Sequence, residues 1–404
     1  MSDIINVMDQ TKRKRPFSRA IYVIVLPIIF IGGIYFGQNV DINFIGNNAN
    51  VSVKGQKSLD YSSVDEAYNT LISSYDGQLD ESKLIDGLKK GLTEATEDPY
   101  TEYFSAEESK AFDEQISGAF VGIGAELGKE DNAVVIVAPL KGYPAEKAGV
   151  KAKDIILKIN DEDALSLGIS DAVKKIRGEK GTSVKLNVLR GGTEQLEFNI
   201  VREEIKIPSV EYEVLDGSVG YIRISRFSDD TNDLVEEAAK DFKAKGVTSL
   251  LVDLRNDPGG YLEQAIQVAS HWVDSGKTVV SEKRSGKVIQ THKAVNGQEF
   301  KGMKTIVLVN EGSASASEIL AGALKDYGLA TLVGEKTYGK GSVQQVNKLS
   351  GETSIKVTIA RWFTPNDKNI DKEGIEPDEK VEITPEQFKV GEDPQKARAL
   401  ELAK

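Results

Sequence analysis

A short apolar run followed by a turn of small residues is where this sequence places a potential nucleophile. The run spans residues 305–309, and the turn contains Ser313, Ser315 and Ser317. Beyond it, apolar residues recur at helical spacing. A strand–turn–helix of this kind presents a hydroxyl at a helix N-terminus, where free backbone N–H groups and the helix dipole favour developing negative charge. Ser315 and Glu318 also have capping-box spacing, so a helix cap explains the same residues without catalysis.

A catalytic serine needs a neighbouring base to take its proton. The chain has two histidines, His271 in an apolar helical pattern and His292 in a polar stretch. We expect both to be structural, because neither lies in a tight turn or beside a carboxylate suited to a triad. Lysine replaces histidine in known variants of the triad. Lys340 lies between Gly339 and Gly341, which permit a close approach to another segment. A solvated turn lysine is the alternative interpretation.

Two motifs together resemble those of the C-terminal processing proteases, namely Gly312-Ser313-Ala314-Ser315-Ala316-Ser317-Glu318 and Gly339-Lys340-Gly341-x-Val343-Gln344-Gln345. Members of this family are serine endopeptidases that contain a PDZ domain, use a Ser-Lys dyad and have a core related to the crotonase/Clp protease fold. Lys340 follows Ser315 by 25 residues, which matches the family's spacing. The resemblance, which runs from about Ser58 to the C-terminus, implies Ser315 as nucleophile and Lys340 as general base.

The same resemblance implies roles for residues around the dyad. Gln344 matches the position that orients the lysine, and Asp326 matches an acidic position that the family often has nearby. The family uses the loop at residues 255–260 for its oxyanion hole, so the N–H of Gly259 or Gly260 would act with that of Ala316. An ordinary turn between a strand and a helix is the alternative reading of these glycines.

Composition excludes several classes of site. A chain of 404 residues can hold two or three domains, and its net charge of −12 argues against a nucleic-acid partner. The absence of cysteine excludes disulfides, thiolate zinc sites and a cysteine nucleophile. With two histidines, little remains for a transition-metal site. We therefore expect neither a metal nor a cofactor.

The N-terminal sequence predicts a membrane anchor. A basic segment, residues 1–19, precedes an uncharged apolar run from Ala20 to Gly37, which has the length of a transmembrane helix. The positive flank should stay in the cytoplasm. A cleaved signal peptide is the alternative, but no small-residue cleavage site follows. We expect a single-pass protein of a bacterial cell membrane, with a linker at residues 38–57 and the catalytic part outside the cytoplasm.

The next two regions are predicted to be a helical arm and a PDZ domain. Residues 58–117 show amphipathic helical patterns, and the resemblance implies that this region forms a homodimer; packing on its own protease domain is the alternative. Residues 118–202 have the element order of a PDZ domain. Its carboxylate-binding loop would be Gly122-Ile123-Gly124, beside which a peptide adds as an extra strand. We expect it to capture protein substrates with free apolar C-termini. Arg177 matches a position that the family links to sensing the bound tail.

The remaining sequence completes an α/β protein. Residues 203–384 alternate strands and helices and form the predicted Ser-Lys protease domain, followed by a helical tail at residues 385–404 that starts at Asp393-Pro394. The predicted fold is thus an α/β core of the crotonase/Clp protease type with an inserted β-rich PDZ domain, an N-terminal helical arm and a transmembrane helix.

Three other functions compete with a serine endopeptidase. The segment from Gly334 to Lys340 is nearly a phosphate-binding loop, but Gly341 stands where Ser or Thr would hold magnesium and no helix follows. A crotonase-like acyl-transfer enzyme would explain neither the PDZ pattern nor the Ser-Lys spacing. A catalytically silent PDZ scaffold is the third alternative, and a serine-reactive probe distinguishes it from an active protease.

Overall fold

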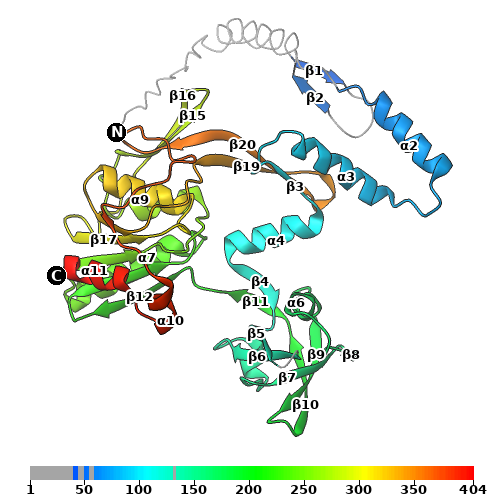
Figure 1. Ribbon diagram of the computed structural model, residues 1–404, viewed down its shortest axis with the longest axis horizontal. Helices are drawn as coiled ribbons and strands as arrows, with labels where there is room; N and C mark the ends of the chain where they lie inside the picture. The colour runs from blue at the N-terminus through cyan, green and yellow to red at the C-terminus, as the bar shows by residue number, and fades with distance from the viewer. Residues whose placement is uncertain (1–39, 44–49, 54–58, 131–132) are drawn as a thin grey trace, which may run out of the picture. The chain divides into compact units, whose positions relative to one another are not determined.

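The computed structural model describes residues 40–43, 50–53, 59–130 and 133–404 (Figure 1). The chain forms two compact units, Met1–Glu81 and Ser82–Lys404. In the first unit, β1 (Val40–Asn43) pairs antiparallel with β2 (Asn50–Val53), and α2 (Ser62–Ser74) follows. No helix within the described ranges is long and apolar enough to cross a membrane. The predicted span, residues 20–37, lies outside those ranges.

The second unit begins with two amphipathic helices separated by a short strand: α3 (Glu81–Glu94), β3 (Glu102–Phe104) and α4 (Ala106–Ser117). Helix α4 starts at a capping box, in which Ser105 and Glu108 satisfy each other's backbone N–H groups. It ends at Gly118, which has φ +66° and so adopts the left-handed conformation favoured at helix C-termini. The chain then turns into the PDZ region.

A separate antiparallel sheet module forms between α4 and the protease core, as the sequence predicted. Its strands run in the order β10-β9-β7-β6-β5, with β8 paired to β7. These strands and the two helices that accompany them are β5 (Ala125–Glu130), β6 (Ala133–Pro139), α5 (Pro144–Lys147), β7 (Ile155–Ile159), β8 (Glu162–Asp163), α6 (Ile169–Ile176), β9 (Ser183–Arg190) and β10 (Glu194–Val201). Inward-facing Val184, Leu186 and Val188 alternate along β9 and are fully buried in the core of the module.

One antiparallel strand pair carries the chain into this module and out of it. Strand β4 (Ala119–Gly122) enters and β11 (Glu203–Lys206) returns, with Glu203 opposite Gly122 and Lys206 opposite Ala119. Beyond β11, Ile207 donates its N–H to the carbonyl of Gly118 at 3.2 Å. The two connections therefore meet at residues 118 and 207. Hereafter this pair, with Gly118 and Ile207, is called the PDZ connection.

The protease core is built on a six-stranded sheet in the order β12-β13-β14-β17-β18-β21. Strand β12 is antiparallel to β13, and the others are parallel. The strands are β12 (Val210–Leu215), β13 (Val219–Ile224), β14 (Ser249–Asp253), β17 (Lys304–Val309), β18 (Thr331–Gly334) and β21 (Glu379–Lys380). Parallel strands require crossovers, and helices supply them.

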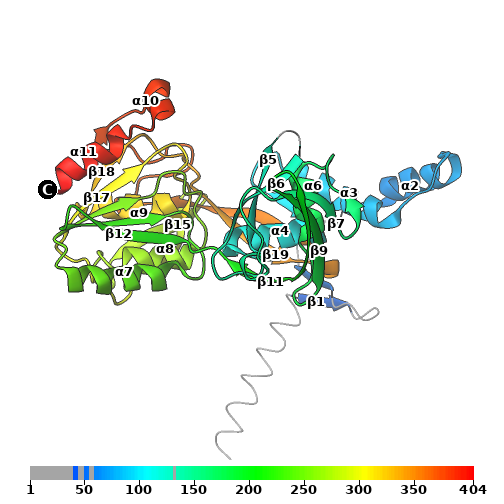
Figure 2. The same ribbon diagram turned by 90° about the horizontal axis from the view of Figure 1, so that it is seen from below.

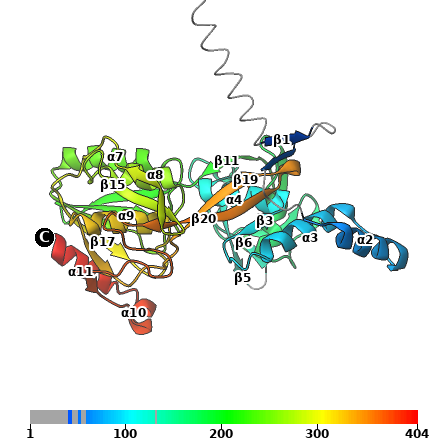
Figure 3. The same ribbon diagram turned by 90° about the horizontal axis from the view of Figure 1, so that it is seen from above.

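Helices cover both faces of this sheet (Figures 2 and 3). One face packs against α7 (Thr231–Lys245), α8 (Leu262–Ala269) and α9 (Ala316–Asp326). The other packs against α11 (Pro394–Ala403), which follows α10 (Pro385–Val390) and buries Ala399 and Ala403. Asp393 caps α11 by accepting the N–H of Lys396, and proline occupies the first turn, as predicted. Because both faces are covered, the middle of β14 and of β17 is a continuous apolar run, residues 250–252 and 306–309.

A second, antiparallel sheet lies beside the first, in the order β16-β15-β20-β19 with β3 paired to β20. Its strands are β15 (Thr278–Arg284), β16 (Lys287–Lys293), β19 (Ser342–Lys348) and β20 (Ser354–Phe363), and a short 3-10 turn, η1 (Ser350–Glu352), joins the last two. Val343, Ala360 and Trp362 join the same buried core as α9. The second sheet thereby brings the segment that follows Lys340 against the helix that follows Ser315.

Candidate active site

The nucleophile turn is held in a strained conformation between β17 and α9. Ser315 has φ +56° and ψ −113°, a backbone region that costs a non-glycine residue about 1–3 kcal/mol. Its two neighbouring serines are fully buried and used to fix the turn. Ser313 donates its hydroxyl to Leu254 O at 2.8 Å, and Ser317 donates to Asp257 O at 3.0 Å. Of the three serines, Ser315 is therefore the one left at the surface of the turn.

Glu318 connects this turn to the loop that contains Thr337, Gly339 and Lys340, which is called the lysine loop below. Its side chain is fully buried and accepts four hydrogen bonds, from the N–H groups of Ser315, Gly339 and Lys340 and from the hydroxyl of Thr337. The sequence predicted only the helix-capping part of this role. Burial raises the pKa of the Glu318 carboxyl above its usual range, and the four donors oppose that shift. One carboxylate thus fixes two segments that lie more than twenty residues apart.

Lys340 lies half-buried at the end of that loop. Within the described residues its ammonium has no hydrogen bond or ion pair; it lies 5.8 Å from the centroid of the Tyr100 ring. Burial lowers the pKa of Lys340 below its usual value, and the positive charge of Lys356 lowers it further. Glu102 and Glu318 act in the opposite direction. A lysine in this environment gives up its proton more readily than one in water.

Gln344 lies on β19 near the lysine, but its amide is directed elsewhere. The Nε2 group donates to Ser342 Oγ at 2.6 Å and to Thr358 Oγ1 at 3.5 Å. It makes no hydrogen bond to Lys340 in the described part of the chain. Its carbonyl oxygen Oε1 accepts no hydrogen bond from any described residue, so the contact with Lys340 that the sequence predicts through this oxygen is not formed here.

The loop at residues 255–260 packs directly on the nucleophile turn. A Cβ added to Gly259, which has φ +95°, would lie 2.6 Å from Ala314 O and 2.8 Å from both Ala316 N and Ser315 Cβ. Only glycine fits there. The N–H of Gly259 already donates to Asp257 Oδ1 at 2.8 Å. Across the described residues, the N–H groups of Gly260 and Ala316 have no such acceptor, so they are the available donors for an oxyanion.

Asp257 is a buried acid that the sequence analysis did not single out. It is fully buried, and its Oδ2 has no hydrogen-bond partner among the described residues. Burial raises its pKa to about 8, against the opposing effects of the Gly259 N–H, Ser317 and the charge of Arg226. No sequence motif marks such a group, because its environment comes from the turn at Ser313–Ser317 packing over it.

These segments surround one cleft of about 700 Å³. Its lining includes Ser315, Ala316, Gly259, Gly260, Lys340 and Gln344, so six of the seven site residues predicted on the protease domain share one site. Apolar side chains from the second sheet and α9 line much of the rest, including Ile319, Val343, Ile359 and Trp362. Such a cleft suits an extended peptide with apolar side chains.

Both histidines have carboxylate partners, although the sequence placed neither of them beside a carboxylate suited to a triad. His271 Nδ1 lies 2.6 Å from Glu299 Oε2, and His292 Nε2 lies 2.7 Å from Glu282 Oε1. The first pair packs against Trp272 and Phe300 and does not line the cleft. The second lines it, on β15 and β16. Glu299 lies in a turn 28 residues from His271, and Glu282 faces His292 across the pairing of β15 with β16, ten residues away. Neither partner is a sequence neighbour, so the local pattern did not show them.

Asp326, the acidic residue expected near the dyad, lies at the opposite end of α9 from Ser315. Eleven helical residues place it about 16 Å away along the axis. It accepts the N–H of Asn366 at 2.8 Å and forms an ion pair with Lys368, and it does not line the cleft. Its observed contacts are structural.

The predicted peptide-binding residues of the PDZ module lie beside an open strand edge. Gly122-Ile123-Gly124 joins β4 to β5, and β5 is the edge strand of its sheet, next to α6. The N–H groups of Ile123 and Gly124 have no acceptor within the described ranges. Arg177, at the end of α6, donates to Glu114 Oε2 of α4 at 2.7 Å, and its guanidinium lies 4.4 Å from the centroid of the Phe120 ring.

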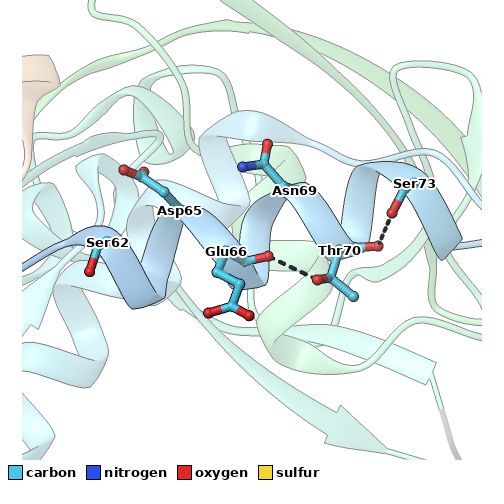
Figure 4. A pocket seen from close by; sticks show the side chains of 6 residues that line it. All are labelled: Ser62, Asp65, Glu66, Asn69, Thr70 and Ser73. Carbon is cyan, nitrogen blue, oxygen red and sulfur yellow. Dashed lines mark hydrogen bonds between the residues drawn. The ribbon is translucent and has the colours of Figure 1, made fainter.

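The polar face of α2 forms a separate shallow surface (Figure 4). Six residues of this one helix line it, and two of their hydroxyls donate back to the helix: Thr70 to Glu66 O and Ser73 to Thr70 O. These residues include no base paired with a nucleophile. The catalytic interpretation therefore rests on the cleft at Ser315.

Comparison with known proteins gives a consistent result. Peptidase family S41 matches residues 218–381, a PDZ domain matches residues 135–190, and the N-terminal domain of the activating protease CtpB matches residues 29–108. The carboxy-terminal processing protease CtpA of Bacillus subtilis (strain 168) is 38% identical over 340 residues, which cover 83% of this chain and 72% of that protein. The chain belongs to the carboxy-terminal processing proteases of peptidase family S41.

This protease resembles other members to a similar degree. A probable CtpA-like serine protease of Staphylococcus aureus (strain COL) is 37% identical over 368 residues, covering 87% of this chain and 74% of that protein. The crystal structure of a putative S41 protease from Bacteroides fragilis NCTC 9343 has the same fold, with a TM-score of 0.50 and 16% identity over 81% of this chain and 92% of that one. The protein is a serine-type C-terminal processing peptidase with a PDZ domain.

Proposed function

We propose that this peptidase cleaves protein substrates with Ser315 as nucleophile and Lys340 as general base, after its PDZ domain has captured a free apolar C-terminus. The single observation that carries the dyad is the Glu318 carboxylate. It accepts the backbone N–H groups of both Ser315 and Lys340 at 2.9 Å and so holds the two residues at one cleft. The core relation to the crotonase/Clp protease fold, inferred from the motifs, is part of the same proposal.

The proposed reaction begins with proton transfer from the Ser315 hydroxyl to neutral Lys340, as the oxygen attacks the scissile carbonyl. The carbonyl oxygen becomes an oxyanion that accepts hydrogen bonds from the N–H groups of Ala316 and Gly260. Lys340 then donates its proton to the leaving amine, and an acyl-Ser315 ester remains. Water, deprotonated by Lys340, attacks this ester, and Ser315 recovers its proton as the product acid leaves.

Three features support recognition of C-termini by the PDZ domain. The N–H groups of Ile123 and Gly124 can bind a carboxylate, the β5 edge can pair with a peptide backbone, and α6 lies next to that edge. A free terminal carboxylate is needed for the first contact. Amidation of a substrate's C-terminus should therefore raise KM, and unchanged cleavage of the amidated substrate would exclude this mode of recognition.

The membrane anchor and the homodimer are further proposals. The apolar run at residues 20–37 supports a single span, with the protease on the outer side of a bacterial cell membrane. On α3, Ile85, Leu88 and Leu92 are about half exposed and share one helix face, which supports a second copy of this chain as the partner. Carbonate extraction of membranes tests the anchor. Light scattering of Leu88→Asp, with Ser82→Asp as control, tests the dimer: only the first should yield monomers.

The dyad is tested with a fluorophosphonate probe and a peptide that ends in a free apolar C-terminus. Wild-type enzyme should be labelled at Ser315 and should cleave the peptide. Ser315→Ala should lose both activities, while Ser317→Ala, which retains the nucleophile, should still be labelled. Labelling of Ser315→Ala at the wild-type rate would exclude Ser315 as the nucleophile.

A further inference from the structure

Arg226 lies where the PDZ connection meets the protease core. It follows β13 and donates from its guanidinium to the carbonyl of Ile207. On the entering side, a Cβ added to Gly118 would lie 2.2 Å from Arg226 Nε and from its terminal nitrogen. Gly118 and Ile207 are themselves joined by a backbone hydrogen bond. One guanidinium therefore contacts both ends of the chain segment that forms the PDZ domain.

Phe227, the residue after Arg226, contacts the loop at residues 255–260, which carries the predicted oxyanion donors and is called the oxyanion loop below. Phe227 donates its N–H to Gly259 O at 2.9 Å and accepts the N–H of Tyr261 at 2.8 Å. Gly260 packs so closely on this residue that an added Cβ would lie 2.0 Å from Phe227 O. Phe227 itself is fully buried. A displacement of the backbone at Arg226 is thus transmitted to both glycines of the loop.

The side chains of Arg226 and Asp257 each contain one buried polar atom that makes no hydrogen bond to the described residues. Arg226 Nε and Asp257 Oδ2 are each buried without a hydrogen bond to any described residue. Their opposite charges interact, and Arg226 lines the cleft together with Gly259 and Gly260. Asp257 Oδ1 accepts the N–H of Gly259, a residue whose α-carbon packs against the nucleophile turn. Buried polar atoms without hydrogen bonds are costly, so an arrangement that pairs Arg226 Nε with Asp257 Oδ2 is favoured.

We propose that Arg226 is a positioning residue that couples the PDZ connection to the oxyanion hole by exchanging Ile207 O for the carboxylate of Asp257. A guanidinium can bind both oxygens of a carboxylate and favours its ionised form, so this exchange competes for Oδ1 and releases the N–H of Gly259, which is next in sequence to the Gly260 donor of the oxyanion hole. Movement of the PDZ connection sets which partner Arg226 takes. The inference rests on the proposed recognition of C-termini and adds the route by which a bound tail changes the rate of cleavage.

The test compares two peptides with the same cleavable core, one with a free apolar C-terminus and one amidated. For wild-type enzyme we expect the free peptide to have a kcat about 10-fold higher than the amidated one. Arg226→Gln should bring this ratio close to one by lowering kcat for the free peptide, with its KM changed less than twofold. Arg226→Lys keeps the positive charge but cannot bind both oxygens of a carboxylate with two parallel N–H groups, so it should give an intermediate ratio. Arg223→Gln, at an exposed position on β13, should retain the wild-type ratio.

A double substitution distinguishes this route from a general loss of structure. If Arg226 acts through Asp257, Asp257→Asn alone should also lower the ratio, and adding Arg226→Gln should change it no further. A wild-type ratio in folded Arg226→Gln overturns the inference but leaves the proposed function intact. If Arg226→Gln does not fold, a wild-type ratio in Arg226→Lys has the same meaning. A ratio of one in the wild-type enzyme overturns both the recognition of C-termini and this coupling.

Discussion

Glu318 and the backbone N–H of Lys340 are joined by a 2.9 Å hydrogen bond, and the same carboxylate oxygen accepts the N–H of Ser315. The distance between nucleophile and base is therefore set by a third residue that has no proton to transfer in the proposed reaction. Misplacement of reacting groups by about 1 Å can cost about 100-fold in rate. The catalytic competence of the dyad should depend on this buried acid.

Glu318→Gln should lower kcat by about 100-fold, because an amide replaces one acceptor oxygen with a donor that faces backbone N–H groups. We expect the free energy of unfolding to fall by about 1–3 kcal/mol for the same reason. Steady-state hydrolysis and urea unfolding provide the measurements, with Glu311→Gln at an exposed position of the same turn as control. A kcat within threefold of wild type would show that Glu318 does not position the dyad.

Lys340 should control the acidic limb of the pH–rate profile. Neutral lysine is the reactive form, so kcat/KM should rise with pH, with a midpoint below the ordinary lysine value because burial lowers the pKa of Lys340. Lys340→Arg should abolish turnover, since guanidinium does not lose its proton in this range. Gln344→Glu should move the midpoint upward by adding negative charge. Wild-type rates in Lys340→Arg would remove the lysine from the mechanism.

The ion pair between Lys356 and Glu102 should tune the same midpoint in opposite directions. Their charged atoms lie 2.6 Å apart, and Lys356 lowers the pKa of Lys340 while Glu102 raises it. Lys356→Gln should therefore shift the midpoint to higher pH, and Glu102→Gln should shift it to lower pH, each by a few tenths of a unit up to about one unit. The exposed Lys372→Gln is a matched control. Shifts of the same sign in both variants would contradict this electrostatic assignment.

Asp257 should make the protein less stable as pH rises. Its folded pKa of about 8 lies above its unfolded value near 3.8, so the folded state retains a proton that the unfolded state loses between these values. Stability therefore falls across this window and levels off above it. Asp257→Asn should be more stable than wild type at pH 9, by about 1–3 kcal/mol, and should lose this advantage below pH 4. Urea unfolding at both pH values gives the comparison, and a pH-independent difference would exclude the linkage.

The C-terminal helix should stabilise the loop that bears Gly259 through Arg255. This guanidinium is largely buried and pairs with Asp253 and, at 2.8 Å, with Asp393 at the start of α11. Asp393→Ala removes both this partner and the helix cap, so we expect a loss of about 2–4 kcal/mol in unfolding free energy. Asp393→Asn keeps the cap and should lose less. Equal losses in the two variants would show that the ion pair contributes little.

The family, the residue types of the proposed dyad and most of the helices and strands could be predicted from the sequence. These features are local: a turn of small residues after an apolar run predicts the position of Ser315, and alternation predicts strands such as β9. The resemblance to the family added Lys340 through its spacing from Ser315, and Gly259 or Gly260 through the loop that the family uses for its oxyanion hole. Asp393 and Pro394 predicted the start of α11 for the same reason, since a helix cap is set by neighbours in sequence.

Which of these residues contact one another, how far each is buried and which hydrogen-bond partners it has could be seen only in the three-dimensional structure. Glu318 reads as a helix cap in the sequence, yet it binds the lysine loop because β18 runs beside β17 and brings that loop back over α9. Asp326 follows Ser315 closely in sequence but lies at the other end of a rigid helix, so it is absent from the cleft. The burial of Asp257, the pairing of His271 with Glu299 and the contact of Arg226 with both ends of the PDZ connection arise from segments that are not neighbours in the chain. Hydrogen bonds and desolvation act over a few ångströms in space, and sequence separation does not encode those distances.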